Sequence, residues 1–174
     1  GGESDAWVET ILSAIDMEGT ALRMVDCVDL LEEQEREGMQ SLPGHSHDHE
    51  HEDHDHGREG QGLGVVTGMD EHVWTAPENA ATITRIIGGT LAGLDPEHSE
   101  AYQTAAEAYA AEIDRLDAKF SAFFDGLEDR TIIFGDRFPL LYFAEAYDLD
   151  YYAAFPGCGA QTEPSAATVA FLTE

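Results

Sequence analysis

Helical and strand-like hydrophobic patterns alternate along this chain. Apolar side chains recur at three- and four-residue steps after Asp5 and again after Pro77, which predicts an amphipathic helix at each place. Proline suits the first turn of a helix because it needs no N–H donor there. Short apolar runs predict buried strands at 21–28, 130–134 and 151–155. This alternation predicts an α/β fold.

The longest predicted element is a helix from Asp95 to about Asp125. Asp95 is a good N-cap and is followed at once by a proline. The apolar residues of this helix recur regularly, and we expect them in the core: Tyr102, Ala105, Tyr109, Ile113, Leu116, Phe120, Phe123 and Leu127. We expect His98 to face solvent rather than bind a ligand. A helix of this length could join two sheets.

The C-terminal third of the chain offers one candidate ligand beside a strand. Asp136 comes shortly after the predicted strand 130–134, and short helices are predicted at 140–147 and 165–172. In open α/β sheets, ligands gather at the carboxyl ends of the strands. Asp136 is therefore a candidate binding residue, although an Asp after a strand is as often a helix cap.

The charge balance of the chain is strongly acidic. Eight Lys and Arg residues face 36 Asp and Glu residues, which gives a formal charge of -28 over 174 residues. Such a surface repels nucleic acid phosphates and anionic lipid headgroups, so we exclude both as primary partners. No apolar stretch approaches the roughly 20 residues that a membrane helix needs. Multivalent cations are the natural counter-charge.

Six of the eight histidines lie in one short tract between Gly44 and Gly57. They are His45, His47, His49, His51, His54 and His56, and they are separated mostly by carboxylates. The tract has no apolar residue, so we predict a disordered loop over about 41–62. Imidazole binds zinc, copper and nickel, so the loop is predicted to bind metal with low affinity. An expression tag is the alternative interpretation, but a tag is normally terminal and unbroken.

His72 is the second candidate ligand. It follows Asp70 and Glu71 and precedes Trp74. Zinc sites combine His nitrogen with carboxylate oxygen, and a ligating His needs an acceptor for its other ring N–H. An ordinary packed histidine remains the alternative. A disulfide between Cys27 and Cys158 is left equally open, since two distant thiols give weak evidence for a bridge.

Three segments together resemble one protein family. Residues 70–80 read D-E-H-V-W-T-A-P-E-N-A and resemble the signature D-P-H-x-W-x-x-P-x-N-A of the zinc and manganese solute-binding proteins of bacterial ABC importers, the ZnuA-like receptors. Residues 142–147 resemble that family's Y-F-x-x-x-Y-G segment, and 163–166 resemble its E-P-S-A helix start. The His-rich tract lies shortly upstream of the first signature, as in the family's zinc members.

The resemblance implies an α/β fold made of parts of two Rossmann-like lobes, with a metal cleft between them. Residues 1–94 would form part of the N-terminal lobe, 95–127 the long connecting helix, and 128–174 the start of the C-terminal lobe.

The resemblance also implies which residues bind the metal. His72 carries over as a metal ligand. The family's next ligand aligns with Arg137, which cannot bind a cation because it is always protonated, so we predict that the neighbouring Asp136 takes that role. We expect the remaining ligands to lie before Gly1 and beyond Glu174.

The resemblance thus implies an extracytoplasmic receptor that captures a divalent metal and delivers it to the membrane permease of an ABC importer. Zinc is the expected ion and manganese the alternative, and we expect a monomer. A metal-buffering or adhesion-type surface protein that acts through the His-rich loop is the alternative function. A zinc hydrolase built on His72 and Asp136 is a third hypothesis, but no catalytic motif supports it, and we predict that the protein is not an enzyme.

Overall fold

The computed structural model describes residues 6–14, 21–39, 68–157 and 163–174. The His-rich tract, the residues 65–67 and Cys158 lie outside these described residues. The elements follow in the order α1 (Ala6–Ala14), the 3-10 turns η2 (Met24–Asp26) and η3 (Val73–Thr75), α2 (Pro77–Leu94), η4 (Pro96–His98), α3 (Ser99–Phe124), β1 (Thr131–Arg137), α4 (Leu141–Ala146), β2 (Asp150–Phe155) and α5 (Ala166–Thr173).

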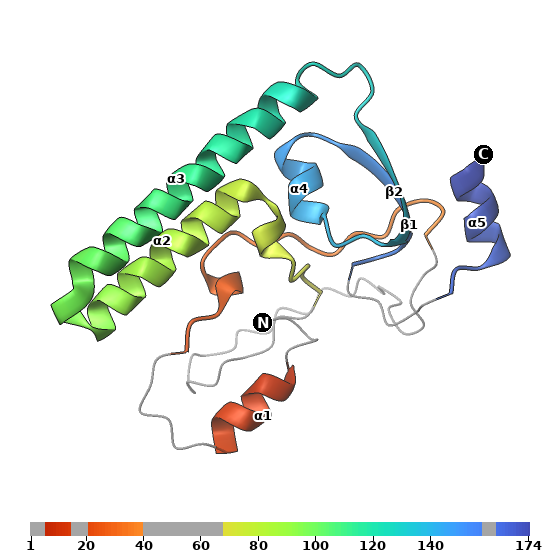
Figure 1. Cartoon of the computed structure of the whole chain (residues 1–174). Coiled ribbons are helices and arrows are strands. Elements are labelled where there is room, and N and C mark those ends of the chain that lie inside the picture. Colours follow the sequence, from red (N-terminus) through yellow and green to blue (C-terminus); the bar gives the residue numbers. More distant parts are fainter. Residues whose placement is uncertain (1–5, 15–20, 40–67, 158–162) are drawn as a thin grey trace, which may run out of the picture.

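Helices α2 and α3 run side by side as an antiparallel hairpin (Figure 1). Small residues let the two helices approach closely. Gly88 of α2 lies directly against Ala106 of α3. A Cβ added at Gly88 would stand only 2.4 Å from the Cβ of Ala106, so the position has no room for a larger residue. Arg85 of α2 also donates to Glu107 at 3.0 Å and to Asp114 at 2.7 Å, so an ion-pair network fixes the hairpin along its solvent side.

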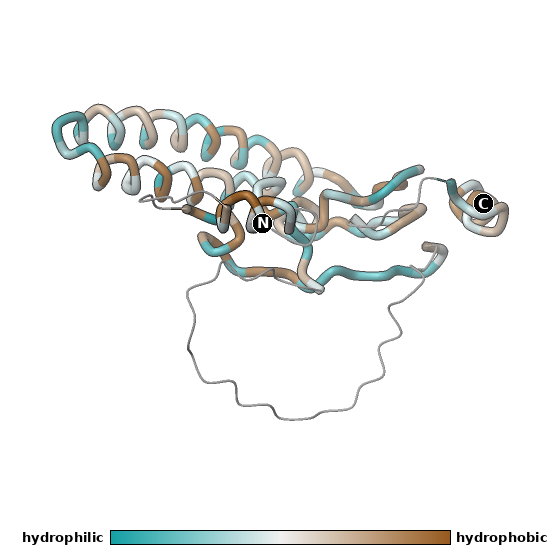
Figure 2. The backbone as a smooth tube through the Cα atoms, turned by 90° about the horizontal axis from the view of Figure 1, so that it is seen from below, coloured by the Kyte–Doolittle hydropathy of each residue, from teal (hydrophilic) through white to brown (hydrophobic). Residues whose placement is uncertain are grey.

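The prediction that the apolar stripe of α3 lies in the core is wrong for its outer members. Tyr109, Leu116 and Phe123 are 60%, 46% and 60% exposed. Ala105 is exposed as well, and so is Leu127, which lies beyond the end of α3, whereas Ala110 is fully buried. The close approach to α2 is made at a small residue of α3, Ala106, rather than at these large apolar side chains. Figure 2 shows the mixture of hydrophobic and hydrophilic positions along both helices.

The start of the long helix also differs from the prediction. Asp95 does not cap the helix through its side chain; a separate 3-10 turn, η4, comes first. The Asp95 carboxylate instead accepts a hydrogen bond from the Tyr102 hydroxyl at 3.1 Å and lies 2.9 Å from Nδ1 of His98. His98 is exposed, as predicted. The Asp95 carboxylate thus contacts the side chains of His98 and Tyr102 instead of accepting hydrogen bonds from backbone N–H groups at the helix start.

Strands β1 and β2 form a parallel pair with helix α4 as their connection. Their register places Thr131 opposite Asp150, and the register shifts between Phe134 and Arg137. β1 continues to Arg137, so Asp136 belongs to the strand itself rather than to a loop after it. Buried residues around α4 and β2 form the core of this unit: Phe138, Leu141, Ala144, Tyr147, Leu149, Tyr151 and Ala153. Helices and parallel strands in this order confirm the predicted α/β class.

The α3 helix is fastened to this unit by aromatic side chains. Phe120 of α3 meets Phe143 of α4 edge to face, with ring centroids 5.2 Å apart, and Phe124 meets Tyr147 at the same distance. The Tyr147 hydroxyl donates to Asp117 at 2.6 Å. The C-terminal half of α3 is therefore anchored to α4, while its N-terminal half extends away with α2 (Figure 1).

The strand predicted at 21–28 is wrong. An ion pair between Arg23 and Asp26, with N–O distances of 2.7 Å, closes a 3-10 turn there, and Val25 alone is buried. The chain becomes extended only afterwards, where Leu31 accepts from the Asp70 N–H at 2.9 Å and the Glu33 N–H donates to Gly68 at 3.0 Å. This short antiparallel contact brings the segment 30–33 beside 68–70.

Helix α5 lies at the end of the molecule opposite the α2–α3 hairpin in both views (Figures 1 and 2). The predicted helix start at 163–166 is confirmed, and the Ser165 hydroxyl caps it by accepting the Thr168 N–H at 3.1 Å. Its Phe171 ring packs on Gly38, where any Cβ would overlap the ring. Among the described residues, none of the helices combines the length and apolar character needed to cross a bilayer.

Two adjacent glycines of α2 should respond oppositely to alanine. Gly89→Ala should stabilise the protein by about 0.5–1 kcal/mol, because nothing lies near the new Cβ and alanine favours the helix. Gly88→Ala should destabilise it by about 1–3 kcal/mol, because the new Cβ overlaps Ala106. Chemical denaturation of both variants measures the difference, and a Gly88→Ala variant as stable as Gly89→Ala would contradict the close helix contact.

Candidate metal site

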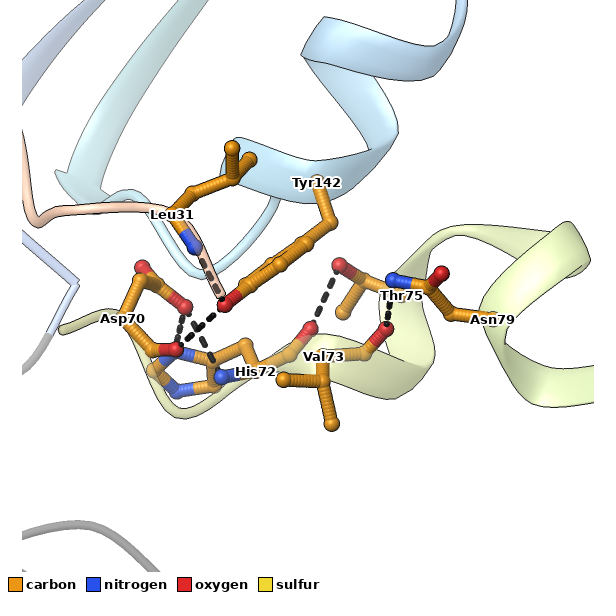
Figure 3. Close-up of polar contacts among 7 residues, drawn as sticks. All are labelled: Leu31, Asp70, His72, Val73, Thr75, Asn79 and Tyr142. Atoms are coloured by element: carbon orange, nitrogen blue, oxygen red, sulfur yellow. Dashed lines mark hydrogen bonds and ion pairs between the residues drawn. The ribbon is translucent and has the colours of Figure 1, made fainter. Parts of the chain in front are cut away.

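The residues 70–72 form a tight turn directly before η3 (Figure 3). Asp70 is 1% exposed, which is unusual for a carboxylate and requires that its oxygens be hydrogen-bonded. Its Oδ1 atom accepts the backbone N–H of His72 at 2.8 Å and lies 3.1 Å from Nδ1 of the same residue. The side chain of Asp70 therefore holds both the backbone and the ring of His72.

This contact determines which ring nitrogen of His72 can bind a metal. An ionised carboxylate only accepts hydrogen bonds, so Nδ1 carries the proton and Nε2 presents its lone pair. A carboxylate that accepts the ring N–H fixes the imidazole orientation and makes the ligating nitrogen more basic. A metal-binding histidine needs such an acceptor, and Asp70 provides one for His72.

The surroundings of His72 raise its pKa above the usual value. The hydrogen bond to Asp70 is the largest cause, and partial burial opposes it by disfavouring the charged ring. The negative charges of Asp70, Glu71 and Glu33 add further upward shifts. The imidazole therefore holds a proton more tightly than an isolated histidine does, and a metal must compete with that proton.

The sequence of the turn explains how the chain is held between His72 and α2. The Thr75 hydroxyl donates to the His72 carbonyl at 2.8 Å, and the Asn79 amide donates to the Val73 carbonyl at 3.0 Å (Figure 3). Val73 is fully buried, whereas Trp74 is 47% exposed with its ring 5.7 Å from that of His72. The turn is thus anchored by one buried side chain and two side-chain hydrogen bonds.

The carboxyl ends of the two strands lie against this turn. A Cβ placed on Gly157, just after β2, would stand 2.9 Å from the carbonyl oxygen of Phe138, 3.0 Å from Oδ2 of Asp70 and 3.4 Å from Cε1 of His72. Phe138 follows β1 directly. The glycine therefore permits a close approach of the strand ends to the His72 ring, which is where ligands of α/β sheets gather.

Asp136 lies close to this strand end in sequence but is exposed on β1. Its Oδ1 atom accepts the N–H of Arg137 at 2.8 Å. Within the part of the chain that the structure describes, no group of three or more His, Cys, Asp or Glu side chains is arranged to hold one metal ion. The described residues thus provide His72 with its acceptor, and the ligand roles of His72 and Asp136 both stay predictions.

Cys27 lies at the end of η2 and packs against the core cluster that contains Val73. Its thiol donates weakly to the Arg23 carbonyl at 3.4 Å, and burial together with the Asp26 charge raises its pKa. The thiol is therefore less reactive than an exposed one. Because Cys158 is outside the described residues, the bridge between them stays untested.

Two residues of the turn's support were not identified as such from the sequence. Asp70 appeared only as an acidic neighbour of His72, although an Asp two residues before a His commonly accepts that residue's backbone N–H. Tyr142 of α4 appeared only as the first residue of the family-like segment 142–147, yet its hydroxyl accepts the Leu31 N–H at 3.1 Å and donates to the Asp70 carbonyl at 2.8 Å. Only the tertiary structure brings that hydroxyl to the turn.

The profile of the family described as "ZnuA: Zinc-uptake complex component A periplasmic" matches residues 1–174. The chain belongs to this zinc-uptake component A family. Among curated relatives, the iron ABC transporter substrate-binding lipoprotein MtsA of Streptococcus pyogenes is 30% identical over 79 residues, which cover 45% of this chain and 26% of MtsA. A putative metal-binding protein of Treponema pallidum is 34% identical over 64 residues, or 37% of this chain and 20% of that protein.

Solved structures of the ZnuA family share the fold. A Zn(II)-bound variant of AdcAII from Streptococcus pneumoniae has a TM-score of 0.53 at 28% identity over 60% of this chain and 38% of that one. A structure of ZnuA has a TM-score of 0.54 at 26% identity over 66% and 41%. The laminin-binding adhesin Lmb of Streptococcus agalactiae has a TM-score of 0.54 at 26% identity over 63% and 40%.

These likenesses confirm the predicted fold class, that of the two-lobed ZnuA-type receptors with a long helix. They also confirm the predicted membership in the metal-binding, substrate-binding proteins of ABC transporters. The chain spans about a quarter of the length of MtsA and about two fifths of the solved relatives.

Asp70→Asn should lower the pKa of His72, because the substitution removes the negative acceptor while the ring stays partly buried. In a variant that lacks residues 45–56, His72 and His98 are the two histidines left in this chain. An NMR titration of their ring signals can therefore assign the change in pKa to His72. The His98 signal should be the same in both proteins. An unchanged His72 titration would contradict the role of Asp70.

The same pair gives stability a definite pH dependence. The folded-state pKa of His72 lies above its unfolded value, so the Asp70–His72 pair stabilises the fold fully below the unfolded value of about 6.5. That contribution is lost as the pH rises through the folded-state pKa. The difference in stability between the unsubstituted chain and Asp70→Asn should therefore shrink from mildly acidic to alkaline pH.

Proposed function

We propose that this chain is part of an extracytoplasmic receptor that binds a divalent metal through His72 and delivers it to the permease of an ABC importer. The observation that carries the proposal is the Asp70–His72 pair, in which a buried carboxylate holds Nδ1 and leaves Nε2 for a metal. Membership in the zinc-uptake component A family supports the same conclusion.

Zinc is the proposed cargo, with manganese as the alternative. An imidazole nitrogen favours zinc over the harder manganese ion, and an added carboxylate from Asp136 would be acceptable to both. The names of the relatives point to more than one metal, since AdcAII was solved with Zn(II) whereas MtsA is named for iron. Competition between zinc, manganese and iron(II) for the same site would decide the preference.

Family membership supports a proposal for the delivery route and the cellular location. MtsA is a lipoprotein of an ABC transporter, so we propose that this protein also works outside the cytoplasm and meets a membrane permease. We propose that it acts as a monomer and as a receptor rather than an enzyme. The tract with His45, His47, His49, His51, His54 and His56 is proposed as a low-affinity collector of the same ion.

A zinc titration of the full-length protein tests this function. With residues 45–56 deleted, one tight equivalent of zinc should remain, because the receptor site at His72 is separate from the tract. His72→Ala in that background should abolish the tight equivalent, whereas His98→Ala should leave it intact, because His98 is exposed and already paired with Asp95.

Loss of all zinc binding with the tract deleted would reject the receptor site and favour a metal-buffering or adhesion-type protein. The likeness to the laminin-binding adhesin Lmb is the observation that favours this second function. Binding of laminin by the full-length protein, measured with and without residues 45–56, would test that alternative directly.

Asp136→Ala should weaken zinc binding by about 10-fold or more if its carboxylate is a ligand, since a lost ligand costs at least as much as a lost supporting residue. Asp129→Ala is the matched control. Asp129 precedes the opposite end of β1 and also accepts a nearby backbone N–H, that of Thr131 at 3.0 Å. Equal zinc affinity in the two variants would remove Asp136 from the ligand set.

A further inference from the structure

Tyr142 connects helix α4 to two segments that lie far away in sequence. The ring is buried, and the hydroxyl accepts the Leu31 N–H at 3.1 Å while donating to the Asp70 carbonyl at 2.8 Å (Figure 3). These partners precede it by 111 and 72 residues. One hydroxyl therefore joins α4, the segment 30–33 and the His72 turn.

The path from this hydroxyl to the imidazole passes through one residue. The carbonyl of Asp70 receives the Tyr142 hydroxyl, and its carboxylate holds the backbone N–H of His72 at 2.8 Å and Nδ1 at 3.1 Å. The N–H of Asp70 also donates to the Leu31 carbonyl at 2.9 Å. Because the backbone and side chain of Asp70 are both fixed, the direction of the His72 ring is fixed with them.

We propose that Tyr142 is a positioning residue for the metal: through Asp70 it holds the His72 imidazole in the orientation that binds the ion, and so slows release of the ion. This proposal rests on the metal-binding function proposed above. Hydrogen-bonded supports of metal ligands are typically worth 10- to 100-fold in affinity. Tyr142 acts one residue further from the metal than Asp70, so we expect an effect of about tenfold, at the lower end of that range.

The test is the rate of zinc release from the full-length protein. The protein is loaded with one equivalent of zinc and mixed with an excess of a chromophoric chelator. Tyr142→Phe, which keeps the ring and removes only the hydroxyl, should raise the release rate about tenfold and leave the association rate within about twofold. A release rate equal to that of the unsubstituted protein would overturn the proposal.

Two controls separate positioning from a general loss of stability. Tyr152→Phe removes the hydroxyl of a tyrosine whose ring is 41% exposed, and it should leave the release rate unchanged. Gly88→Ala is expected to destabilise the α2–α3 contact, which involves none of the residues around His72. If Gly88→Ala speeds release as much as Tyr142→Phe at matched stability, the proposal is overturned.

A double-mutant cycle with Asp70→Asn tests the route. If Tyr142 acts through Asp70, Tyr142→Phe should change the release rate less in the Asp70→Asn background than in the unsubstituted protein. Equal effects in both backgrounds would overturn the proposal. If the Tyr142→Phe variant does not fold, Asp70→Asn alone must still speed the release of zinc. An unchanged release rate in Asp70→Asn would overturn the proposal.

The His72→Ala variant distinguishes the two levels of failure. If zinc release is the same with and without His72, the proposed metal-binding function fails, and the role of Tyr142 fails with it. If release depends on His72 but not on Tyr142, only the positioning role is rejected.

Discussion

The buried carboxylate of Asp70 is the constraint on which the rest of the site depends. A charge removed from water must be compensated by hydrogen bonds, and here the compensation comes from the backbone and ring of His72. The main chain of Asp70 is hydrogen-bonded to the Leu31 carbonyl and to the Tyr142 hydroxyl. Segments before the His-rich tract, directly after it, and beyond α3 therefore meet at one residue.

The packing of α3, α4 and the two strands holds the groups that contact Asp70 in place. Aromatic contacts between α3 and α4, together with the hydrogen bond from Tyr147 to Asp117, fix α4 and with it the Tyr142 hydroxyl. The strands β1 and β2 end beside the same turn. The space there is narrow, because a Cβ on Gly157 would contact the carbonyl oxygen of Phe138 as well as Asp70 and His72. The outer part of the α2–α3 hairpin extends away from the site, whereas the start of α2 and the C-terminal half of α3 support it.

The chemistry of the turn agrees with the family to which the chain belongs. A receptor for a metal must bind its ion tightly and still release it, and a neutral imidazole supported by a carboxylate can do both because its affinity depends on protonation and orientation. The strongly acidic surface adds a general attraction for cations but no selectivity. Selectivity must come from the full set of ligands and their geometry.

The sequence by itself determined the local elements and the candidate ligand. Apolar spacing predicted the helices α1, α2 and α3, and short apolar runs predicted the strands β1 and β2. The shorter helices α4 and α5 were also predicted, and both overlap segments that resemble the family. It failed at 21–28, where an ion pair between Arg23 and Asp26 closes a turn that hydrophobicity does not register. The signature around His72 marked that residue as a candidate ligand because the spacing of its residues is specific, and its ligand role stays a prediction.

Only the tertiary structure decided which apolar residues are covered and what supports His72. Tyr109, Leu116 and Phe123 have the spacing of core residues, yet small residues elsewhere on α3 form its contact with α2. Tyr142 reaches Asp70 across 72 residues, and nothing local to either residue specifies that contact. Local spacing records which way a side chain faces, whereas the partner that it meets depends on how distant segments pack.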